Sequence, residues 1–473
     1  MRYLLTILLL IAANTGTAQN MQAIHGSPYA GSMAIDYNPA GILNAPFKWD
    51  VTIIGAQVKT MSNGFYLDRY NLLSSSDTVY VVGKDGYYSR YAHASATINL
   101  FHIRYQLSKR SAISVGGNVR SYTNAVTSPL YYSDSLTFTG IAARNLNTPS
   151  LSAAATSNTW AELTMAYARV LSSNTFGRWQ AGVQLSVMRA ISGAYATVSN
   201  VQFESSAIPG NSLLTNGYAQ YGYSSNYDRL DSNNSTFTNI KNFMRGMAMN
   251  VGVSAGIEYV RYWDDAGPFI EPRPDDYNWK LSVALLDIGT NTFTYSGRSA
   301  QAVGVKPNTY ASSLENKFNN IDRAEGLNDS LRSIAQSFRN LNGRFSLRNP
   351  TRLVINFDKQ FDNDYFLNAE LQLNTNRLHN TLHYNSQETT IAAVTARKET
   401  SKWGVYVPLQ YTTTGKVWLG LAGKAGPLLI GLHNLSWLFS KHGFPNGGAY
   451  VSLRIIPGNR KEKDNSLACP TAN

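Results

Sequence analysis

The feature that most constrains this fold is a long alternation of side chains between Gly246 and Tyr262. Apolar residues occupy every second position, and small or polar residues stand between them. Successive side chains of a strand point to opposite faces, so the pattern predicts one apolar and one polar face. The run from Met247 to Tyr259 exceeds the usual strand of about 5–6 residues and is long enough for a tilted strand to cross a membrane.

The same period returns in hairpins along the chain. Residues 101–120 alternate on both sides of a tight turn at 108–111, and residues 353–373 alternate around Asp362-Asn363-Asp364. Charged and amide side chains recur on one face of these strands, which indicates that this face is wet. The residues expected to face a polar lumen are Asn250, Ser254, Glu258, Asn368 and Glu370.

The connections between strands alternate in length. Short turns near 108–111, 172–177 and 362–364 separate long polar stretches near 60–92, 124–157, 197–244 and 291–348, and a short helix is expected within 311–341. Membrane barrels combine short periplasmic turns with long outer loops in this way. About thirteen strands are evident, and such barrels have an even number, so we expect fourteen, with one strand within 380–398. The predicted fold is therefore all-β, a single transmembrane antiparallel β-barrel over residues 47–457.

Aromatic residues gather near the ends of the expected strands. Amphipathic rings favour the membrane–water interface, where they form girdles on both sides of the apolar band of a barrel. The residues expected in these girdles are Trp160, Trp179, Tyr262, Trp263, Trp279 and Trp403.

The first eighteen residues have the features of a cleaved secretory signal. Arg2 supplies a positive charge, Leu4 to Ala13 is almost wholly apolar, and Gly16-Thr17-Ala18 offers small residues for cleavage before Gln19. No later run approaches the roughly 18 apolar residues that a spanning helix needs. Signal and barrel together predict export to the outer membrane of a Gram-negative cell.

Charge and cysteine content narrow the partners. The formal net charge is +12, but the cations are scattered and form no basic stripe interleaved with aromatics, so nucleic acid is not an expected partner. We interpret the excess as loop and rim charge facing phosphate-bearing lipid. The single cysteine, Cys469, stands in a polar tail over residues 458–473, so no internal disulfide holds the fold.

Residues 19–46 are expected to form a plug inside the barrel. The stretch is rich in Gly and Pro and contains no alternating run long enough to span a membrane. Asn38 before Pro39 predicts a helix start, because Asn caps well and Pro is tolerated at the first helical position. With Ala40 and Gly41 these residues form the plug motif; the alternative is a disordered periplasmic leader.

Motifs that carry catalysis elsewhere have simpler explanations here. Gly252 to Gly256 matches the G-x-S-x-G motif, but that motif requires a strand-to-helix turn, and the alternation through Ser254 is unbroken. His379 and His383 have the spacing of two metal ligands on a helix, yet no third ligand is evident. We therefore predict no catalytic residue, no cofactor and no metal site.

Two regions are similar to known outer-membrane proteins. Ser32-Met33-Ala34-Ile35-Asp36-Tyr37-Asn38-Pro39-Ala40-Gly41-Ile42 resembles the Asn-Pro-Ala-Gly signature near the mature N-terminus of FadL-type and PorV-type barrels. Trp403 to Leu409, Gly426 to Leu429 and Leu285 to Gly289 resemble a related family of outer-membrane proteins of unknown function. The resemblance implies a fourteen-strand barrel with an N-terminal segment folded into the lumen. FadL relatives move hydrophobic molecules and PorV relatives serve a secretion system, so it does not choose between these functions.

The function expected first is a passive conduit for a small hydrophobic solute, since a wet lumen and a candidate plug suit a conduit. The alternative is a non-catalytic scaffold or shuttle in an outer-membrane secretion or surface-protein assembly. A second alternative is an outer-membrane hydrolase. The expected partners are outer-membrane lipid, a hydrophobic small molecule and, under the first alternative, secretion or surface proteins.

Overall fold

The computed structural model describes residues 21–70, 75–231, 233–263, 273–319, 321, 323–362, 364–378, 385–439, 442–443 and 446–457. The expected signal peptide, the cleavage site before Gln19, His379, His383 and the tail with Cys469 lie outside the described residues.

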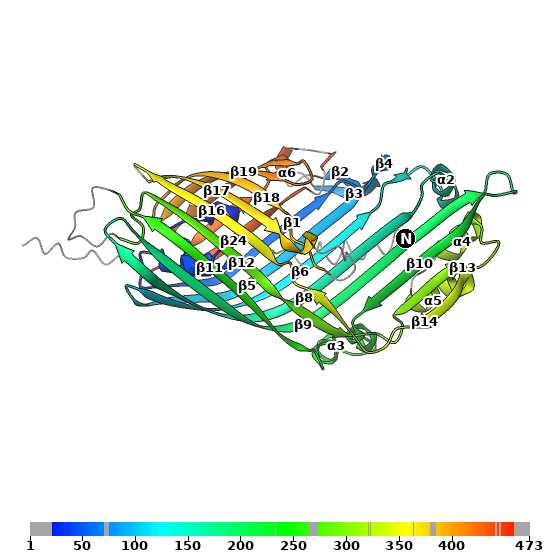
Figure 1. The fold of residues 1–473 in the computed structure, drawn as a ribbon, viewed down its shortest axis with the longest axis horizontal. Coiled ribbons are helices and arrows are strands. Elements are labelled where there is room, and N and C mark those ends of the chain that lie inside the picture. Colours follow the sequence, from blue (N-terminus) through cyan, green and yellow to red (C-terminus); the bar gives the residue numbers. More distant parts are fainter. Residues whose placement is uncertain are drawn as a thin grey trace, which may run out of the picture.

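Fourteen antiparallel strands close into one barrel, as the sequence predicts (Figure 1). Each strand pairs with its neighbours in chain order, and the last strand pairs with the first. In ring order they are β1 (Trp49–Ser62), β5 (Tyr91–Ser108), β6 (Ser111–Thr127), β8 (Leu151–Asn174), β9 (Gly177–Ser205), β11 (Met249–Arg261), β12 (Trp279–Thr294), β16 (Arg352–Phe361), β17 (Tyr365–Asn374), β18 (Ile391–Glu399), β19 (Trp403–Thr412), β21 (Leu421–Ala425), β22 (Leu428–Leu432) and β24 (Gly447–Ile455). β20 (Val417–Leu419) precedes β21, and both pair with β19. β18 supplies the strand expected within 380–398.

This barrel carries apolar side chains on its outer face and charged side chains on its inner face, which is the reverse of a water-soluble protein. Met249 and Val251 on the outer face are 74% and 65% exposed, whereas Asp50, Arg104 and Arg397 on the inner face are fully buried. Apolar side chains outside and charged ones inside are the arrangement of a barrel surrounded by lipid. No helix in the described part of the chain is long and apolar enough to cross a membrane.

The outer face yields a first prediction about stability. Val253 lies midway along β11 and pairs with Leu185 on β9, at mid-height of the apolar belt. Val253→Arg should destabilise the barrel by about 2–4 kcal/mol, and Met249→Arg, beside the native Arg189 at the edge of the belt, by about 0–1 kcal/mol. Urea unfolding in phospholipid vesicles measures both, and equal costs at the two positions would show that the belt is placed wrongly.

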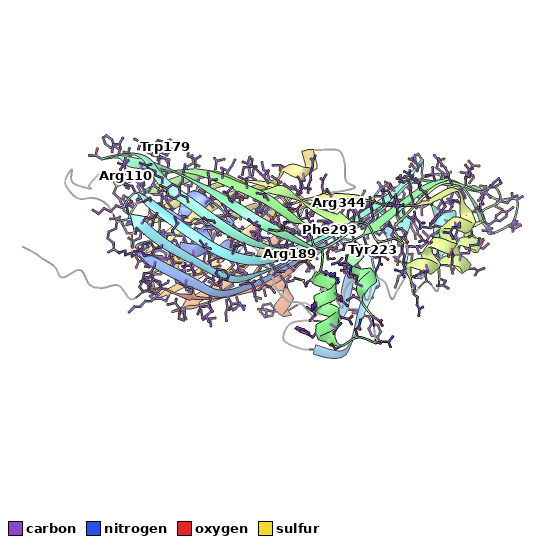
Figure 2. The ribbon with its side chains drawn as sticks, turned by 90° about the horizontal axis from the view of Figure 1, so that it is seen from below. Arg110, Trp179, Arg189, Tyr223, Phe293 and Arg344 are labelled. Carbon is purple, nitrogen blue, oxygen red and sulfur yellow. The ribbon has the colours of Figure 1, made fainter. Side chains whose placement is uncertain are left out.

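One aromatic girdle lies at the end of the barrel that carries the short turns, named here the short-turn rim. Tyr259 stands between Trp179 and Trp279, with ring centroids 4.9 and 5.4 Å away. Figure 2 places Arg110 and Trp179 at this end and Arg189 where the barrel passes into the part beyond it.

Two residues predicted for the girdles do not reach the interface. Trp160 is 1% exposed and points inward, where its Nε1 donates to Glu162 Oε2 at 3.0 Å. Tyr262 is also buried, at 5% exposure. Trp160 stands at an inward position of β8. The alternation of the strand therefore determines its environment, although the residue lies near a strand end in the sequence.

Beyond the barrel, β9 continues into a sheet extension. There it pairs with β10 (Ser212–Tyr223), which pairs with β13 (Ala300–Val305), which pairs with β14 (Ala335–Asn340). The outward face of this extension is covered by α2 (Phe138–Arg144), α4 (Ala311–Phe318) and α5 (Ala324–Ile334), at the right of Figure 1. Burial beneath α5 raises the pKa of Tyr221, whose hydroxyl donates to Asn328 Oδ1 at 2.8 Å.

The prediction of long polar loops is therefore wrong for parts of 124–157, 197–244 and 291–348, where strands continue. Their alternation is weak in the sequence, because Ser, Thr, Tyr and Gly fill both faces of the sheet beyond the membrane. The single helix expected within 311–341 is the pair α4 and α5. The other elements are β2 (Phe65–Tyr70), β3 (Ser75–Gly83), β4 (Gly86–Tyr88), β7 (Leu130–Tyr132), β15 (Arg344–Arg348), β23 (His442–Gly443), η4 (Ser225–Arg229), η5 (Thr375–Leu378), α3 (Thr236–Met244) and α6 (Ser436–Phe439).

Candidate functional site: a filled lumen and an apolar cavity

Residues 21–47, named here the N-terminal segment, are folded into three short 3-10 helices, η1 (Gln22–Ile24), η2 (Gly31–Asp36) and η3 (Pro39–Leu43). η3 begins at Pro39, and the Asn38 side chain accepts a hydrogen bond from the Ala40 nitrogen at 3.0 Å. Almost every residue of the segment is buried. Because 3-10 turns leave many backbone groups without partners, the burial must be matched by donors from elsewhere.

The donors come from cationic side chains on the inner wall. Lys280 Nζ donates to the Gly26 carbonyl at 2.7 Å, and an Arg352 nitrogen donates to the Asp36 carbonyl at 2.8 Å. Arg454 donates to the carbonyls of Tyr29 and Ala30. These long side chains satisfy carbonyls that no regular helix or sheet would satisfy.

Side chains of the segment also bond to carboxylates on strands around the ring. His25 Nδ1 lies 2.7 Å from Glu370 Oε2 on β17, and Ser27 Oγ donates to Glu399 Oε2 on β18 at 2.9 Å. Asn44 donates to Glu258 Oε1 on β11 at 2.6 Å. The Ser32 nitrogen also donates to Asp50 Oδ2 on β1 at 2.7 Å, so the segment contacts strands on several sides of the ring.

Two wall glycines make room for η3. Gly182 on β9 and Gly256 on β11 are directly paired across the two strands. A Cβ on Gly182 would come within 2.5 Å of the Ala40 nitrogen, and a Cβ on Gly256 would collide with Asn38 Oδ1. Gly256, the second glycine of the G-x-S-x-G match, thus serves close packing against the plug motif, whereas a Cβ on Gly252 would meet Met188.

A network of ion pairs on the inner wall beneath η1 links side chains of neighbouring strands to one another. Arg397 makes two bonds to the Asp358 carboxylate, at 2.7 and 2.8 Å, and its Nε lies 2.7 Å from Glu399 Oε1. Asp358 also accepts from Asn368 at 2.9 Å and from the Tyr277 hydroxyl. All three charged groups are fully buried, so each depends on the others for compensation.

On the other side of the N-terminal segment, residues 385–390 fold into the lumen. Glu388 lies 2.5 Å from Lys59 Nζ and 3.5 Å from His93 Nε2, and Gln372 donates to the Thr389 carbonyl at 2.9 Å. A cavity of about 230 Å³ remains beside this loop. Within the described residues, the lumen is thus narrowed by two layers of the chain.

The predicted lumen-facing residues occupy two kinds of position. Ser254, Glu258, Asn368 and Glu370 are buried on the inner face, and Asn250 is half-buried near the beginning of β11. Glu258, Asn368 and Glu370 bond to the N-terminal segment or to the network beneath it. The cationic residues Lys280, Arg352, Arg397 and Arg454 were missed, although each sits at an inward position of an alternating strand.

Ser254 has no catalytic surroundings in the described part of the chain. Its Oγ accepts a hydrogen bond from the Asp287 nitrogen at 3.0 Å, and no His is among its recorded hydrogen-bond partners. The described residues also contain no group of three His, Cys, Asp or Glu side chains placed to hold a metal ion.

An apolar cavity of about 620 Å³ lies outside the lumen, between the outward face of the sheet extension and its covering helices. It is formed where β9 and β10 turn apolar side chains toward α2 and α4. Phe138 and Phe203 meet edge to face across it at 6.1 Å. Glu315 on α4 ties the cover together by accepting from the nitrogen and hydroxyl of Thr139 on α2. The apolar lining includes Phe138, Ile141, Ala153, Val201, Phe203, Leu214, Val305, Leu314 and Phe318.

Such a cavity can hold a small hydrophobic molecule, because its lining is mainly apolar. Its volume falls within the range of ligand pockets, and its few polar groups are held by bonds within the cover. The polar lumen and the apolar cavity are therefore separate in character as well as in place.

Comparison with known proteins gives a family without an assigned activity. The model of a family described as "Family of unknown function (DUF5723)" matches residues 39–432, and no curated protein matches. The solved structures that match include a Pseudomonas aeruginosa FadL homologue, with 12% identity, a TM-score of 0.41, and 93% of this chain and 97% of that chain covered. The P. putida toluene transporter TodX has 13% identity, a TM-score of 0.41 and coverages of 90% and 94%. The Ralstonia pickettii toluene transporter TbuX has 9% identity, a TM-score of 0.38 and coverages of 90% and 92%.

Proposed function

This chain belongs to the family of unknown function DUF5723, as the resemblance in its sequence implies, and we propose that it is an outer-membrane conduit for a small hydrophobic solute. The observation that carries the proposal is the apolar cavity of about 620 Å³ beneath α2 and α4. A water-exposed protein gains nothing from keeping such a volume open, because filling it with side chains would stabilise the fold.

The barrel supports the cellular location of this conduit. Its apolar outer belt and aromatic rim require lipid around it, and closed barrels of this kind span outer membranes. The end bearing the sheet extension then faces the cell exterior, and the short-turn rim faces the periplasm. The cavity is in this way presented to solutes arriving from outside.

The N-terminal segment is the plug of this conduit. Its contacts with strands on several sides of the ring support this role, as do Gly182 and Gly256, which seat η3. Passage of a solute requires the plug, or residues 385–390 beside it, to move. The many charge-assisted bonds that hold the plug make the closed state the resting one.

Filling the cavity tests the proposal. Ala153 lines the cavity from β8, whereas Ala161 lies on the same face of the same strand outside it. Ala153→Trp should weaken binding of a small apolar fluorophore, N-phenylnaphthylamine, by about tenfold or more, since it replaces the ligand's contacts within the pocket. Ala161→Trp should bind the fluorophore as the unaltered protein does. Fluorescence titration in detergent measures both, and equal affinity in the two variants would reject the cavity as the binding site.

The scaffold alternative is favoured by one observation, the protrusion of the sheet extension beyond the barrel (Figure 1). A scaffold would bind protein there. Purification from native membranes separates the two functions: a conduit should retain apolar small molecules, and a scaffold should retain surface or secretion proteins in defined proportion even when Ala153→Trp abolishes fluorophore binding.

A further inference from the structure

Helix α3 and the residues around it form a surface that the proposed function does not use. The helix lies outside the barrel beside β9, at the lower edge of Figure 1. One face holds it to the protein: the Phe243 ring meets Tyr227 edge to face at 5.2 Å, and Asn239 donates to the Asp231 carbonyl at 2.7 Å. Thus α3 is anchored along one side only.

A second, neighbouring face of α3 is apolar and uncovered. Phe237, Ile240 and Met244 are 78%, 57% and 38% exposed, and no residue of α3 is buried. Positions three, four and seven apart share one face of a helix, so these side chains form a single stripe. In water such a stripe would be an unfavourable exposed patch.

The stripe adjoins the lipid-facing belt of the barrel. Only four residues separate Met244 from Met249, where β11 begins at the edge of the belt. Met249 and Val251 are among the most exposed apolar residues of the outer face and pair with Arg189 and Val187. The apolar surface of the barrel therefore continues onto the helix.

Cationic side chains surround the same place. Arg189, Arg229, Lys241 and Arg245 lie on or next to α3, η4 and the edge of the belt, and none of them is in an ion pair within the described part of the chain. Arg229 donates to the Arg245 carbonyl, which brings two of these cations together. An apolar stripe with unpaired cations beside it complements a lipid surface that carries phosphate groups.

We infer that α3 is an interfacial helix that lies in the outer leaflet. Phe237, Ile240 and Met244 insert among the acyl chains, and Lys241 and Arg245 with Arg189 bind the phosphate groups of the lipids. The helix thereby fixes the depth of the barrel on the β9–β11 side. This inference stands independently of the proposed conduit function.

Depth-dependent quenching tests the position of the helix. In a Cys469→Ser background, the full chain carries an NBD fluorophore at Phe237→Cys or at Thr238→Cys and is reconstituted in phosphatidylcholine vesicles containing phosphatidylglycerol. Thr238 is exposed but lies about 100° around the helix from Phe237, which makes it the matched control. Nitroxide on the acyl chains should quench the label at 237 several-fold more than the label at 238, and aqueous iodide should show the reverse.

Two results would overturn the inference. Equal quenching of both labels by iodide would place the helix in water. Shielding of the label at 237 from both quenchers, with a dimer in light scattering, would assign the stripe to a second copy of the chain. Lys241→Glu with Arg245→Glu should lower nitroxide quenching at 237, and an unchanged signal would reject the role of lipid phosphate. Heat-modifiable migration in gels shows that each variant retains its barrel.

Discussion

A chain without residues 19–46 should form open, ion-conducting channels in planar bilayers, where the intact chain conducts little. A fourteen-strand ring is wider than the eight-strand barrels that their own side chains fill, so removing the N-terminal segment leaves an aqueous path beside residues 385–390. The exposed carboxylates and guanidinium groups of the wall would then be solvated. Single-channel recording measures the change, and heat-modifiable migration shows that the barrel still closes.

A point variant gives a milder form of the same result. Gly256→Leu should push η3 from its seat, because its side chain would occupy the place of Asn38. Gly423→Leu is the matched control, since no atom lies within 4 Å of a Cβ built there.

One result would contradict the plug. If the deletion of residues 19–46 leaves conductance unchanged, and protease cuts freely near Asn38 in the intact protein, the segment does not close the lumen.

The largest loss of stability from a single substitution should come from Asp358→Ala. Arg397 would lose two of its bonds while remaining fully buried, and Asn368 and Tyr277 would lose an acceptor. Breaking a buried pair by removing one partner costs about 3–5 kcal/mol. Urea unfolding in vesicles should show a loss of this size.

Two comparisons separate this effect from ordinary loss of a carboxylate. Asp329 pairs with Arg332 on the exposed face of α5, so Asp329→Ala should change stability by no more than about 0.5 kcal/mol. Asp358→Leu combined with Arg397→Met should cost less than the two single changes added together, because the pair is removed whole and only Glu399 loses a partner. A double variant as unstable as the sum of its single changes would contradict the account of the network.

The barrel could be predicted from the sequence because its signal is local. Alternation on β11 and in the hairpins around 108–111 and 362–364 fixes the faces of the strands, and the even number of strands completes the count. The sheet extension could not be predicted, since strands with Ser, Thr and Tyr on both faces carry no such contrast. The girdle prediction for Trp160 was wrong because it relied on the nearness of this residue to a strand end. The alternation of β8 directs the Trp160 side chain inward.

The filled lumen was only partly accessible to sequence reasoning. Asn38 and Pro39 predict a local turn, but the partners of the N-terminal segment come from strands hundreds of residues away, such as Glu370 with His25. The inward cations were visible as alternating residues, but nothing local indicates that they bind backbone carbonyls. The apolar cavity depends on helices from two separate connections, α2 before β8 and the pair α4 and α5 between β13 and β14, so its lining residues share no motif.

Uptake of an apolar solute by whole cells tests the proposed conduit most directly. Cells that contain the intact protein, the Ala153→Trp variant or no copy of the chain are given a radiolabelled apolar solute small enough for the cavity, and its initial rate of entry is followed. The proposal predicts entry several-fold faster with the intact protein than without it, and a rate with Ala153→Trp close to that of cells lacking the chain. Equal rates in all three strains, with the protein folded in the outer membrane, would contradict it.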